Sequence, residues 1–330
     1  MTTTREKLLK ALKKNPGSYI SGSALSEQLG VSRAAVSKHV ACLKQNGYDI
    51  ASSSGKGYLF RETPDLLLPE EIRHGLETAV FGRQIIDYHS LISSTNDRAK
   101  ELAADGAPEG SLVIAEHQSK GRGRKGRSWF SAPGDGICLS LILRPTMGPA
   151  EASKLTLMTA VALAETFSAL TGLAVKIKWP NDILIHGKKL SGILTEMSME
   201  MDRVDYVVVG VGVNVNSPPD HFSQEVSAVA SSLFIETGKP VSRAAVVRTF
   251  LARFEHYYTL VSGNHFRQVM ARWKELSDII GRKVAVDLIG SRITGRVEDV
   301  DDDGLLILKD GEGNIHRVIS GDVLLQDLSP

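Results

Sequence analysis

Residues 21–50 read SGSALSEQLGVSRAAVSKHVACLKQNGYDI, and this stretch decides the fold of the N-terminal part. Apolar side chains recur at helical spacing before and after Gly30, which predicts two short helices that cross around a small shared core. Ser21 or Ser23 is expected to cap the first helix and Ser32 the second, because serine oxygens accept the free backbone N–H groups of a helix start. The stretch therefore predicts a helix-turn-helix.

The flanking segments extend this prediction to a winged helix-turn-helix. Residues 4–14 place leucines on one helical stripe, and Asn15-Pro16-Gly17 ends that helix. Residues 48–60 are predicted to form two short strands around a turn rich in serine and glycine, which is typical of a wing. Three helices and a hairpin are thus expected in a head that spans residues 1–63.

The head carries most of the charge asymmetry of the chain. Residues 1–60 contain nine Lys or Arg residues and three acidic ones, whereas the whole chain has 39 Lys or Arg against 38 Asp or Glu. A basic head on a mildly acidic body indicates a polyanionic partner. The third helix of such a head enters the major groove of DNA, so the candidate contacts are Ser32, Arg33, Ser37 and Lys38. The alternative is a helical interaction module with solvated lysines.

The remaining sequence divides into a mixed body and a β-rich end. Residues 64–273 alternate strand-like and helical patterns, which predicts a mixed α/β domain. The expected strands are 111–116, 136–143, 174–179, 189–197 and 206–215, and the expected helices are 95–104, 151–170 and 242–260. Residues 274–330 hold short β runs separated by Gly and Asp turns, which predicts a small β-barrel. The fold class is therefore α+β.

Composition places the chain among ordinary globular proteins. It is 42% hydrophobic and 23% charged, which excludes a disordered or collagen-like chain. No apolar run reaches the roughly 18 residues that a membrane helix needs, so no membrane association is expected. The two cysteines, Cys42 and Cys138, lie far apart in dissimilar segments, which favours a reducing compartment. We expect a cytoplasmic protein.

The strongest chemical signal is the glycine-arginine loop, residues 120–130, which reads KGRGRKGRSWF. Its first eight residues hold five positive charges and no acid, and its glycines allow backbone N–H groups to approach an anion closely. The order of its glycines matches neither a P-loop nor a Rossmann fingerprint. The loop predicts phosphate or carboxylate binding, and the alternatives are a solvated basic loop or an RNA contact.

Four further motifs accompany this loop, and the set resembles the biotin protein ligase family. They are Ser94-Thr95-Asn96, Glu116-His117-Gln118, Lys178-Trp179-Pro180-Asn181-Asp182, and the run from Lys189 to Glu196. Together with the winged head they resemble the bifunctional members that also repress biotin genes. The resemblance covers essentially the whole chain, with Lys125 standing where the family also accepts arginine. It implies a catalytic domain over residues 64–273 and a terminal SH3-like barrel over residues 274–330.

The resemblance also implies an activity. Such enzymes join biotin to ATP, release pyrophosphate, and pass biotin from the adenylate to a lysine of the biotin carboxyl carrier domain of a carboxylase. Two anions must meet, so the site needs several cations, with Mg²⁺ shielding the triphosphate and no dedicated protein metal site. One head covers only a half-site, so a homodimer on operator DNA is expected, with biotinyl-adenylate as corepressor.

Residue roles follow from the matched motifs. The catalytic residues implied are Lys189, Arg122, Arg124 and Asp182. The biotin-binding residues implied are Ser94, Thr95, Asn96, Gln118, Arg122, Gly123, Arg124 and Lys189. The nucleotide-binding residues implied are Arg127, Trp129, Asn181 and Asn214.

Each of these motifs also has a purely structural interpretation. Ser94-Thr95-Asn96 is a helix N-cap, and Lys188-Lys189 suits a hairpin with exposed lysines. Trp129 can anchor the loop in the core rather than cover a ligand, and Asp182 can be a turn carboxylate. The glycines within residues 207–216 can let an adenosine lie against the backbone, or they can belong to a plain core strand.

Three other functions compete with this one. A lipoate ligase has a related fold, but its arginine followed by a serine and a glycine triplet does not occur here. A vitamin-sensing regulator would keep the pocket without ligase activity. A ligase whose head no longer binds DNA would keep the catalytic residues alone.

Overall fold

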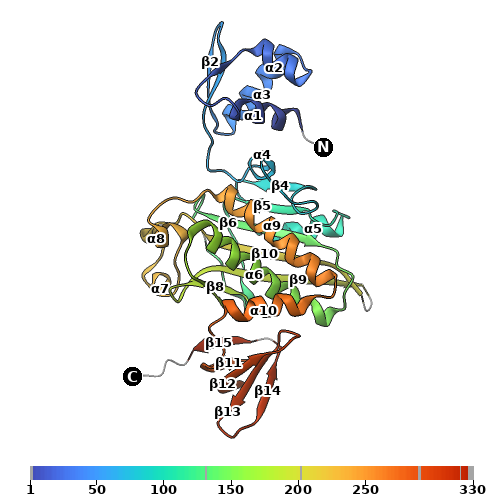
Figure 1. The fold of residues 1–330 in the computed structure, drawn as a ribbon, viewed down its shortest axis with the longest axis vertical. Coiled ribbons are helices and arrows are strands. Elements are labelled where there is room, and N and C mark those ends of the chain that lie inside the picture. The colour runs from blue at the N-terminus through green and yellow to red at the C-terminus, as the bar shows by residue number, and fades with distance from the viewer. Residues whose placement is uncertain (1–2, 131, 201–202, 289–290, 320, 326–330) are drawn as a thin grey trace. The chain divides into compact units, whose positions relative to one another are not determined.

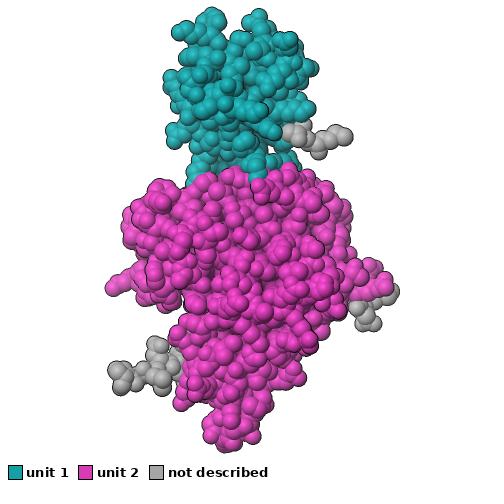
Figure 2. Space-filling model, viewed as in Figure 1, with its two compact units in different colours: residues 1–75 teal, residues 76–330 magenta. Residues whose placement is uncertain are grey.

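The computed structural model describes residues 3–130, 132–200, 203–288, 291–319 and 321–325 (Figure 1). The chain separates into two compact units, Met1–Gly75 and Leu76–Pro330, which Figure 2 colours teal and magenta. No helix among the described residues combines the length and the apolar character that a membrane crossing requires.

The first unit contains the predicted winged helix-turn-helix. Its helices are α1 (Thr4–Lys13), α2 (Gly22–Leu29) and α3 (Arg33–Gln45), and its strands are β1 (Tyr19–Ile20), β2 (Asp49–Ser53) and β3 (Gly57–Glu62). The strands form an antiparallel sheet in the order β1-β3-β2. Ser21 rather than Ser23 caps α2, Ser32 caps α3, and Gly30 ends α2 with a φ of 65°. The capping serines and the helix-ending glycine thus act as the sequence predicts.

The first unit also includes a short helix beyond the head, α4 (Pro69–Arg73). Glu71 of α4 is buried, accepts two hydrogen bonds from Lys13 Nζ at 2.8 and 2.7 Å, and accepts one from the Tyr48 hydroxyl at 2.6 Å. Glu70 is buried beside Arg5 and pairs with it. Residues 64–75 therefore pack with the first unit, although the composition changes at residue 63.

A seven-stranded sheet forms the centre of the second unit. Its order is β4-β5-β6-β10-β9-β8-β7, and of the described strand pairs only β4 and β5 run parallel. The strands are β4 (Ile86–His89), β5 (Leu112–Ala115), β6 (Gly136–Leu143), β7 (Val175–Lys178), β8 (Asp182–Ile185), β9 (Lys188–Glu200) and β10 (Arg203–Asn214). The five predicted strands are confirmed, and the sequence analysis missed β4 and β8, each of four residues.

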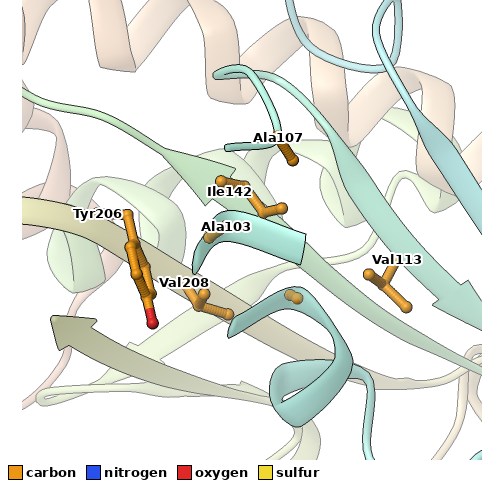
Figure 3. Packing of buried hydrophobic residues seen from close by; sticks show 7 residues of the cluster. Ala103, Ala107, Val113, Ile142, Tyr206 and Val208 are labelled. Atoms are coloured by element: carbon orange, nitrogen blue, oxygen red, sulfur yellow. The ribbon is translucent and has the colours of Figure 1, made fainter. Parts of the chain in front are cut away.

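Helices cover both faces of this sheet. The helix α5 (Thr95–Ala104) covers one face, where Ala99, Ala103, Val113, Ile142 and Val208 are buried together (Figure 3). The helix α6 (Ala152–Thr171) covers the other face. Its Thr156 hydroxyl is hydrogen-bonded to the Thr195 hydroxyl of β9. Thr195 lies opposite Val209 in the strand register, and the side chains of neighbouring residues Val208 and Val209 point to opposite faces. Two further helices, α9 (Arg243–Ser262) and α10 (Phe266–Leu276), pack against α6.

The chain ends in a five-stranded antiparallel sheet within the second unit. Its order is β14-β13-β12-β11-β15, with β11 (Lys283–Asp287), β12 (Arg292–Val300), β13 (Leu306–Asp310), β14 (Ile315–Val318) and β15 (Asp322–Leu325). The indole Nε1 of Trp179 donates to the Gly304 carbonyl at 3.2 Å and so links this sheet to the central one. The α+β class with a terminal β domain is confirmed, whereas α10 and β15 were not predicted.

Candidate active site

One pocket on the α5 face of the central sheet gathers nearly all of the predicted ligand residues. Its empty volume is about 800 Å³, part of which is open to solvent. The predicted residues that line it are Ser94, Thr95, Asn96, Gln118, Arg122, Gly123, Arg124, Arg127, Trp129, Asn181, Asp182 and Lys189. Five separate segments thus converge on one site of the size that small ligands occupy.

A hydrogen-bonded amide and hydroxyl group form the polar end of this pocket. The Thr95 backbone N–H and hydroxyl donate to Gln118 Oε1 at 2.7 and 3.0 Å, and the buried Ser140 hydroxyl donates to Thr95 Oγ1 at 2.8 Å. Ser94 accepts from the Asp97 backbone N–H at 3.3 Å, so the N-cap interpretation is confirmed while Ser94 also lines the pocket. These contacts fix the directions in which the remaining donors and acceptors point.

Asn96 is held deeper in the same end of the pocket. Its amide donates to Glu196 Oε2 at 2.7 Å, and its Oδ1 lies 2.6 Å from the Ser140 hydroxyl. A Cβ on Gly210 would lie 2.1 Å from Asn96 Oδ1, so Asn96 rests directly on the β10 backbone. Only glycine at position 210 leaves room for this side chain.

Arg122 lies at the rim of the pocket and is paired with carboxylates. Its Nη2 is 2.5 Å from Asp97 Oδ1 and 3.8 Å from Glu196 Oε2. Lys100 bridges the same two carboxylates at 3.1 and 3.0 Å. Burial would raise the pKa of Asp97, but hydrogen bonds from Lys100 and Arg122 hold that pKa below its ordinary value. An anionic ligand at Arg122 would therefore compete with Asp97 for the guanidinium.

Arg124 supplies the most enclosed cation of the glycine-arginine loop. It donates to Asn181 Oδ1 at 3.0 Å and to the Gly321 carbonyl at 3.4 Å. Burial lowers the pKa of Arg124, and the negative charges of Asp322 and Asp182 oppose that shift. Because an arginine stays protonated in proteins, Arg124 brings a poorly hydrated positive charge to the pocket.

Lys189 pairs with Asp182 across the neighbouring strands β9 and β8. Lys189 Nζ is 2.7 Å from Asp182 Oδ1 and 5.7 Å from the centre of the Trp129 ring. The preceding residue, Lys188, turns away, and its Nζ donates to the Ser227 carbonyl at 3.0 Å. The alternation of side chains along a strand separates these two lysines, as the sequence predicts.

Trp129 lies flat against the sheet over two glycines. A Cβ on Gly212 would lie 2.3 Å from Trp129 Cε2, and one on Gly192 would lie 3.3 Å from Cζ3. The indole Nε1 is shielded from solvent and has no hydrogen-bond partner among the described residues. Gly212 of β10 and Gly192 of β9 therefore form a flat surface on the sheet, and the Trp129 indole covers it in this structure.

One residue of the site was not predicted from the sequence. Asp322, on β15, lines the pocket and lies 2.7 Å from Arg127 Nη2 and 3.4 Å from Lys125 Nζ. Its partners lie 195 or more positions away along the chain, so no local motif indicates it. The backbone of Gly192 and Gly210 also forms part of the wall.

Asn214 is not among the described residues that line the pocket. It is buried, and its amide donates to the Ser231 carbonyl at 3.0 Å. The same segment flanks the catalytic lysine candidate, because Lys189 N–H donates to Val229 O at 2.7 Å and Ser231 N–H donates to Lys189 O at 2.9 Å. Asn214 thus supports the strand start that carries Lys189.

The candidate DNA-contact residues lie at the start of α3. Arg33 and Ser37 line a shallow concave surface together with the wing residues from Ser52 to Gly55. Lys38 is exposed on the same helix. The Ser32 hydroxyl caps the helix by accepting a hydrogen bond from the Ala35 backbone N–H at 3.1 Å. The surface is therefore basic, polar and open.

Comparisons with known families match three successive parts of the chain. A helix-turn-helix domain model matches residues 4–59, the biotin/lipoate A/B protein ligase family model matches residues 88–214, and the biotin protein ligase C-terminal domain model matches residues 279–326.

Curated relatives match this chain over nearly its whole length. The bifunctional ligase/repressor BirA of Bacillus subtilis is 40% identical over 98% of this chain and 99% of its own length. The protein of the same name from Escherichia coli is 31% identical over 94% of each chain. Among solved structures, the biotin protein ligase from Aquifex aeolicus in complex with biotin and ATP superposes with a TM-score of 0.64 and 28% identity, covering 73% of this chain and 98% of its own.

Proposed function

The chain belongs to the biotin protein ligase family, among its bifunctional ligase/repressors, and from this premise we propose that it activates biotin with ATP and transfers it to a carrier lysine. The observation that carries the proposal is the convergence of Arg122, Arg124 and Lys189 on one pocket beside the Thr95–Gln118 pair. The neutral groups around Gln118, together with the cations of the loop and Lys189, suit a ligand that carries both a carboxylate tail and a ureido ring.

In the first step, a biotin carboxylate oxygen attacks the α-phosphorus of ATP, and pyrophosphate leaves. Both reactants are anions, so the protein has to offset their repulsion and hold them in contact. We assign Arg122 and Arg124 to the carboxylate and phosphate oxygens, and Lys189 to the charge that develops between them. We assign nucleotide binding to Arg127, Trp129 and Asn181. Asn214 is assigned an indirect role in nucleotide binding, because it holds Ser231, which in turn bonds the backbone of Lys189.

The neutral end of the pocket is assigned to the ureido ring. Gln118, Thr95 and Asn96 present amide and hydroxyl groups. The Thr95–Gln118 hydrogen bonds fix the first two, and contacts with Ser140 and Glu196 fix Asn96. A site built in this way rejects analogues that lack the matching donor or acceptor, because its own buried groups would then stay unpaired. Ser94 and Gly123 complete this part of the wall.

In the second step, the amine of the acceptor lysine attacks the carbonyl carbon of the adenylate, and AMP leaves. The attacking amine has to lose a proton, and Asp182 is the carboxylate of the pocket next to Lys189 that can accept it. Asp182, Asp322 and Asn181 also offer oxygen ligands of the kind that Mg²⁺ takes together with phosphate oxygens. Bound Mg²⁺ would neutralise part of the triphosphate charge.

The head is proposed to bind operator DNA through Arg33, Ser37 and Lys38, with Ser32 setting the start of the reading helix. One head covers a half-site, so the operator-bound form is proposed to be a homodimer, with biotinyl-adenylate as corepressor. The functional parts are proposed to be residues 1–63 for DNA, 64–273 for catalysis and 274–330 as the terminal domain. An ATP-dependent reaction on a carboxylase carrier suits a cytoplasmic protein.

The test is transfer of biotin to a carrier. The protein is incubated with biotin, Mg-ATP and a biotin carboxyl carrier domain, and mass spectrometry should find one biotinyl group on a single lysine of the carrier. Lys189→Met should lower the rate of adenylate formation by about 10²- to 10³-fold, as expected when a preorganised charge is removed. The matched control Lys188→Met, which changes the neighbouring outward lysine, should leave the rate within about twofold.

Two results would contradict the proposal. The activity assignment fails if the wild-type protein releases no pyrophosphate when biotin is added. The assignment of Lys189 fails if both lysine variants lose activity equally. Arg33→Ala should abolish specific DNA binding without changing transfer, which separates the two functions.

A further inference from the structure

A buried arginine outside the pocket contacts both ends of the segment that carries the glycine-arginine loop. Arg243 is the first residue of α9, and only 1% of it is exposed. Its Nη1 donates to Glu116 Oε2 at 2.6 Å and to the Gly136 carbonyl at 3.1 Å. Glu116 follows the last residue of β5, and Gly136 is the first residue of β6. The connection between them, residues 117–135, contains Gln118 and the whole loop.

Backbone contacts close the same two ends. The Gly134 N–H donates to the Glu116 carbonyl at 3.3 Å, and the Asn216 N–H donates to the Asp135 carbonyl at 2.7 Å. Glu116 also interacts with Tyr88 of β4, and burial followed by the charge of Glu116 raises the pKa of Tyr88 to about 12. Hydrogen bonds therefore fix the positions of both ends of the connection, and the Arg243 guanidinium bonds to each end.

Helix stability does not explain why an arginine occupies this position. A cation at the N-terminus of a helix opposes the helix dipole. A buried ion pair is also weak evidence for a stabilising role, because apolar residues of similar size often replace such a pair without loss of stability. A geometric role remains, since the planar guanidinium can hold a carboxylate and a carbonyl in one fixed arrangement.

We propose that Arg243 is a positioning residue that sets the geometry of the glycine-arginine loop by tying Glu116 and Gly136 to α9. Gln118 lies two residues after Glu116 and bonds Thr95, so a shift of Glu116 moves the amide assigned to the ureido ring. Arg122 and Arg124 follow on the same connection. The inference rests on the proposed function for its kinetic consequences, but not for its effect on the loop.

The decisive variant removes both charges at once. Arg243→Met combined with Glu116→Gln removes both charges of the buried ion pair together, and the Gln keeps a partner for Tyr88. This double variant should unfold at a temperature close to that of the wild-type protein. Its rate of adenylate formation should still fall by about 10- to 100-fold, since displacements of about 1 Å have effects of this size. Its KM for biotin should rise, whereas its KM for the carrier should not change.

Limited digestion of the ligand-free protein tests the loop directly. Trypsin should cut after Arg122, Arg124, Lys125 and Arg127 faster in the double variant than in the wild-type protein. The control is Arg253→Met, which removes another arginine of α9 that pairs with Glu165 at 3.5 Å. The control should show wild-type cleavage and wild-type kinetics.

The possible outcomes separate this inference from the proposed function. A folded double variant with wild-type cleavage and wild-type adenylate formation overturns the positioning role. Loss of adenylate formation only in proportion to lost folded protein also overturns it. If the double variant does not fold, Arg243→Lys takes its place: faster loop cleavage together with slower adenylate formation in the folded protein supports the role, and wild-type cleavage with wild-type kinetics overturns it. If the wild-type protein makes no adenylate, the proposed function fails while the cleavage test still decides the inference.

Discussion

At the residue scale, two glycines of β10 make room for two different pocket side chains. Gly210 makes room for Asn96, whose Oδ1 would lie 2.1 Å from an added Cβ. Gly212 makes room for the Trp129 indole, whose Cε2 would lie 2.3 Å from an added Cβ. Neither glycine has a positive φ, so each is required for space rather than for backbone conformation.

Alanine at these two positions should therefore separate the two substrates. Gly210→Ala displaces Asn96 and should raise the Kd for biotin about tenfold or more, corresponding to at least one lost hydrogen bond. Gly212→Ala displaces Trp129 and should mainly change nucleotide affinity and the emission of that indole. Isothermal titration with biotin and with ATP checks both. Identical effects of the two variants on biotin would show that the pocket is not divided in this way.

At the element scale, the first turn of α5 combines helix capping, pocket-lining side chains and charge. The folded-state pKa of Asp97 is lowered, so this carboxylate stabilises the fold above its unfolded pKa of about 3.9 and loses that contribution as pH falls through the folded value. Asp97 is partly exposed, so the contribution should be below about 1 kcal/mol.

Asp97→Asn should thus flatten the acid limb of the stability curve. Urea unfolding of both proteins between about pH 6 and pH 3 measures this, and the free energies of unfolding should converge toward the acid end. Asp105→Asn, at the exposed end of the same helix, is the control. A pH slope that Asp97→Asn leaves unchanged would show that the pairing with Arg122 and Lys100 carries no stability.

The elements that the sequence predicted share a visible periodicity or a cap. The bounds of β6 and α5 agree with the prediction, because β6 is a run of apolar residues after a glycine turn and α5 begins at a serine cap. Length alone does not explain why β4 and β8 were missed, because the predicted strands β5 and β7 also have four residues. The sequence of β4, IDYH, has one aliphatic side chain, and β8 begins at Asp182, which was interpreted as a site or turn residue. The missed helix α10 is amphipathic but lies where the β-rich pattern was expected to begin.

The site was predictable wherever its residues sit in short motifs. Residues 94–96, Asn181, Asp182 and part of the loop meet at one pocket because each of these motifs lies next to a strand end or helix start. Asp322 and Arg243 were not predictable, since each acts through partners more than 100 residues away. Asn214 carries a suitable amide, but side-chain direction decides its contact, and it faces Ser231.

At the scale of the whole molecule, charge is divided between the parts. The basic head offers Arg33 and Lys38 on α3, and such residues bind phosphates with release of counterions. Lys38→Ala should weaken binding to all DNA sequences and reduce the slope of log Kd against log salt by about one per head. Lys14→Ala removes the same charge from an exposed site beyond α1 and serves as the control. Equal slopes in both variants would contradict a phosphate contact by Lys38.

The two units should also respond separately to mutation. Glu71→Gln leaves Lys13 and Tyr48 facing a neutral group in a buried site, which should cost the first unit about 1–3 kcal/mol. DNA binding should then fail at a lower temperature, whereas biotin transfer should keep its temperature dependence. Parallel melting curves followed by DNA binding and by transfer measure the difference. A simultaneous loss of both activities would show that the units unfold together.

The indole above Gly192 and Gly212 has a calorimetric consequence. With Trp129 on the glycines, the floor of the pocket is already dry before any adenine arrives. If a planar base displaces the indole from these glycines, one aromatic face replaces another on the same surface. Little additional apolar area is then withdrawn from water. The heat-capacity change on nucleotide binding should accordingly be small for a ligand of that size, and replacing Trp129 with a small residue should make it more negative.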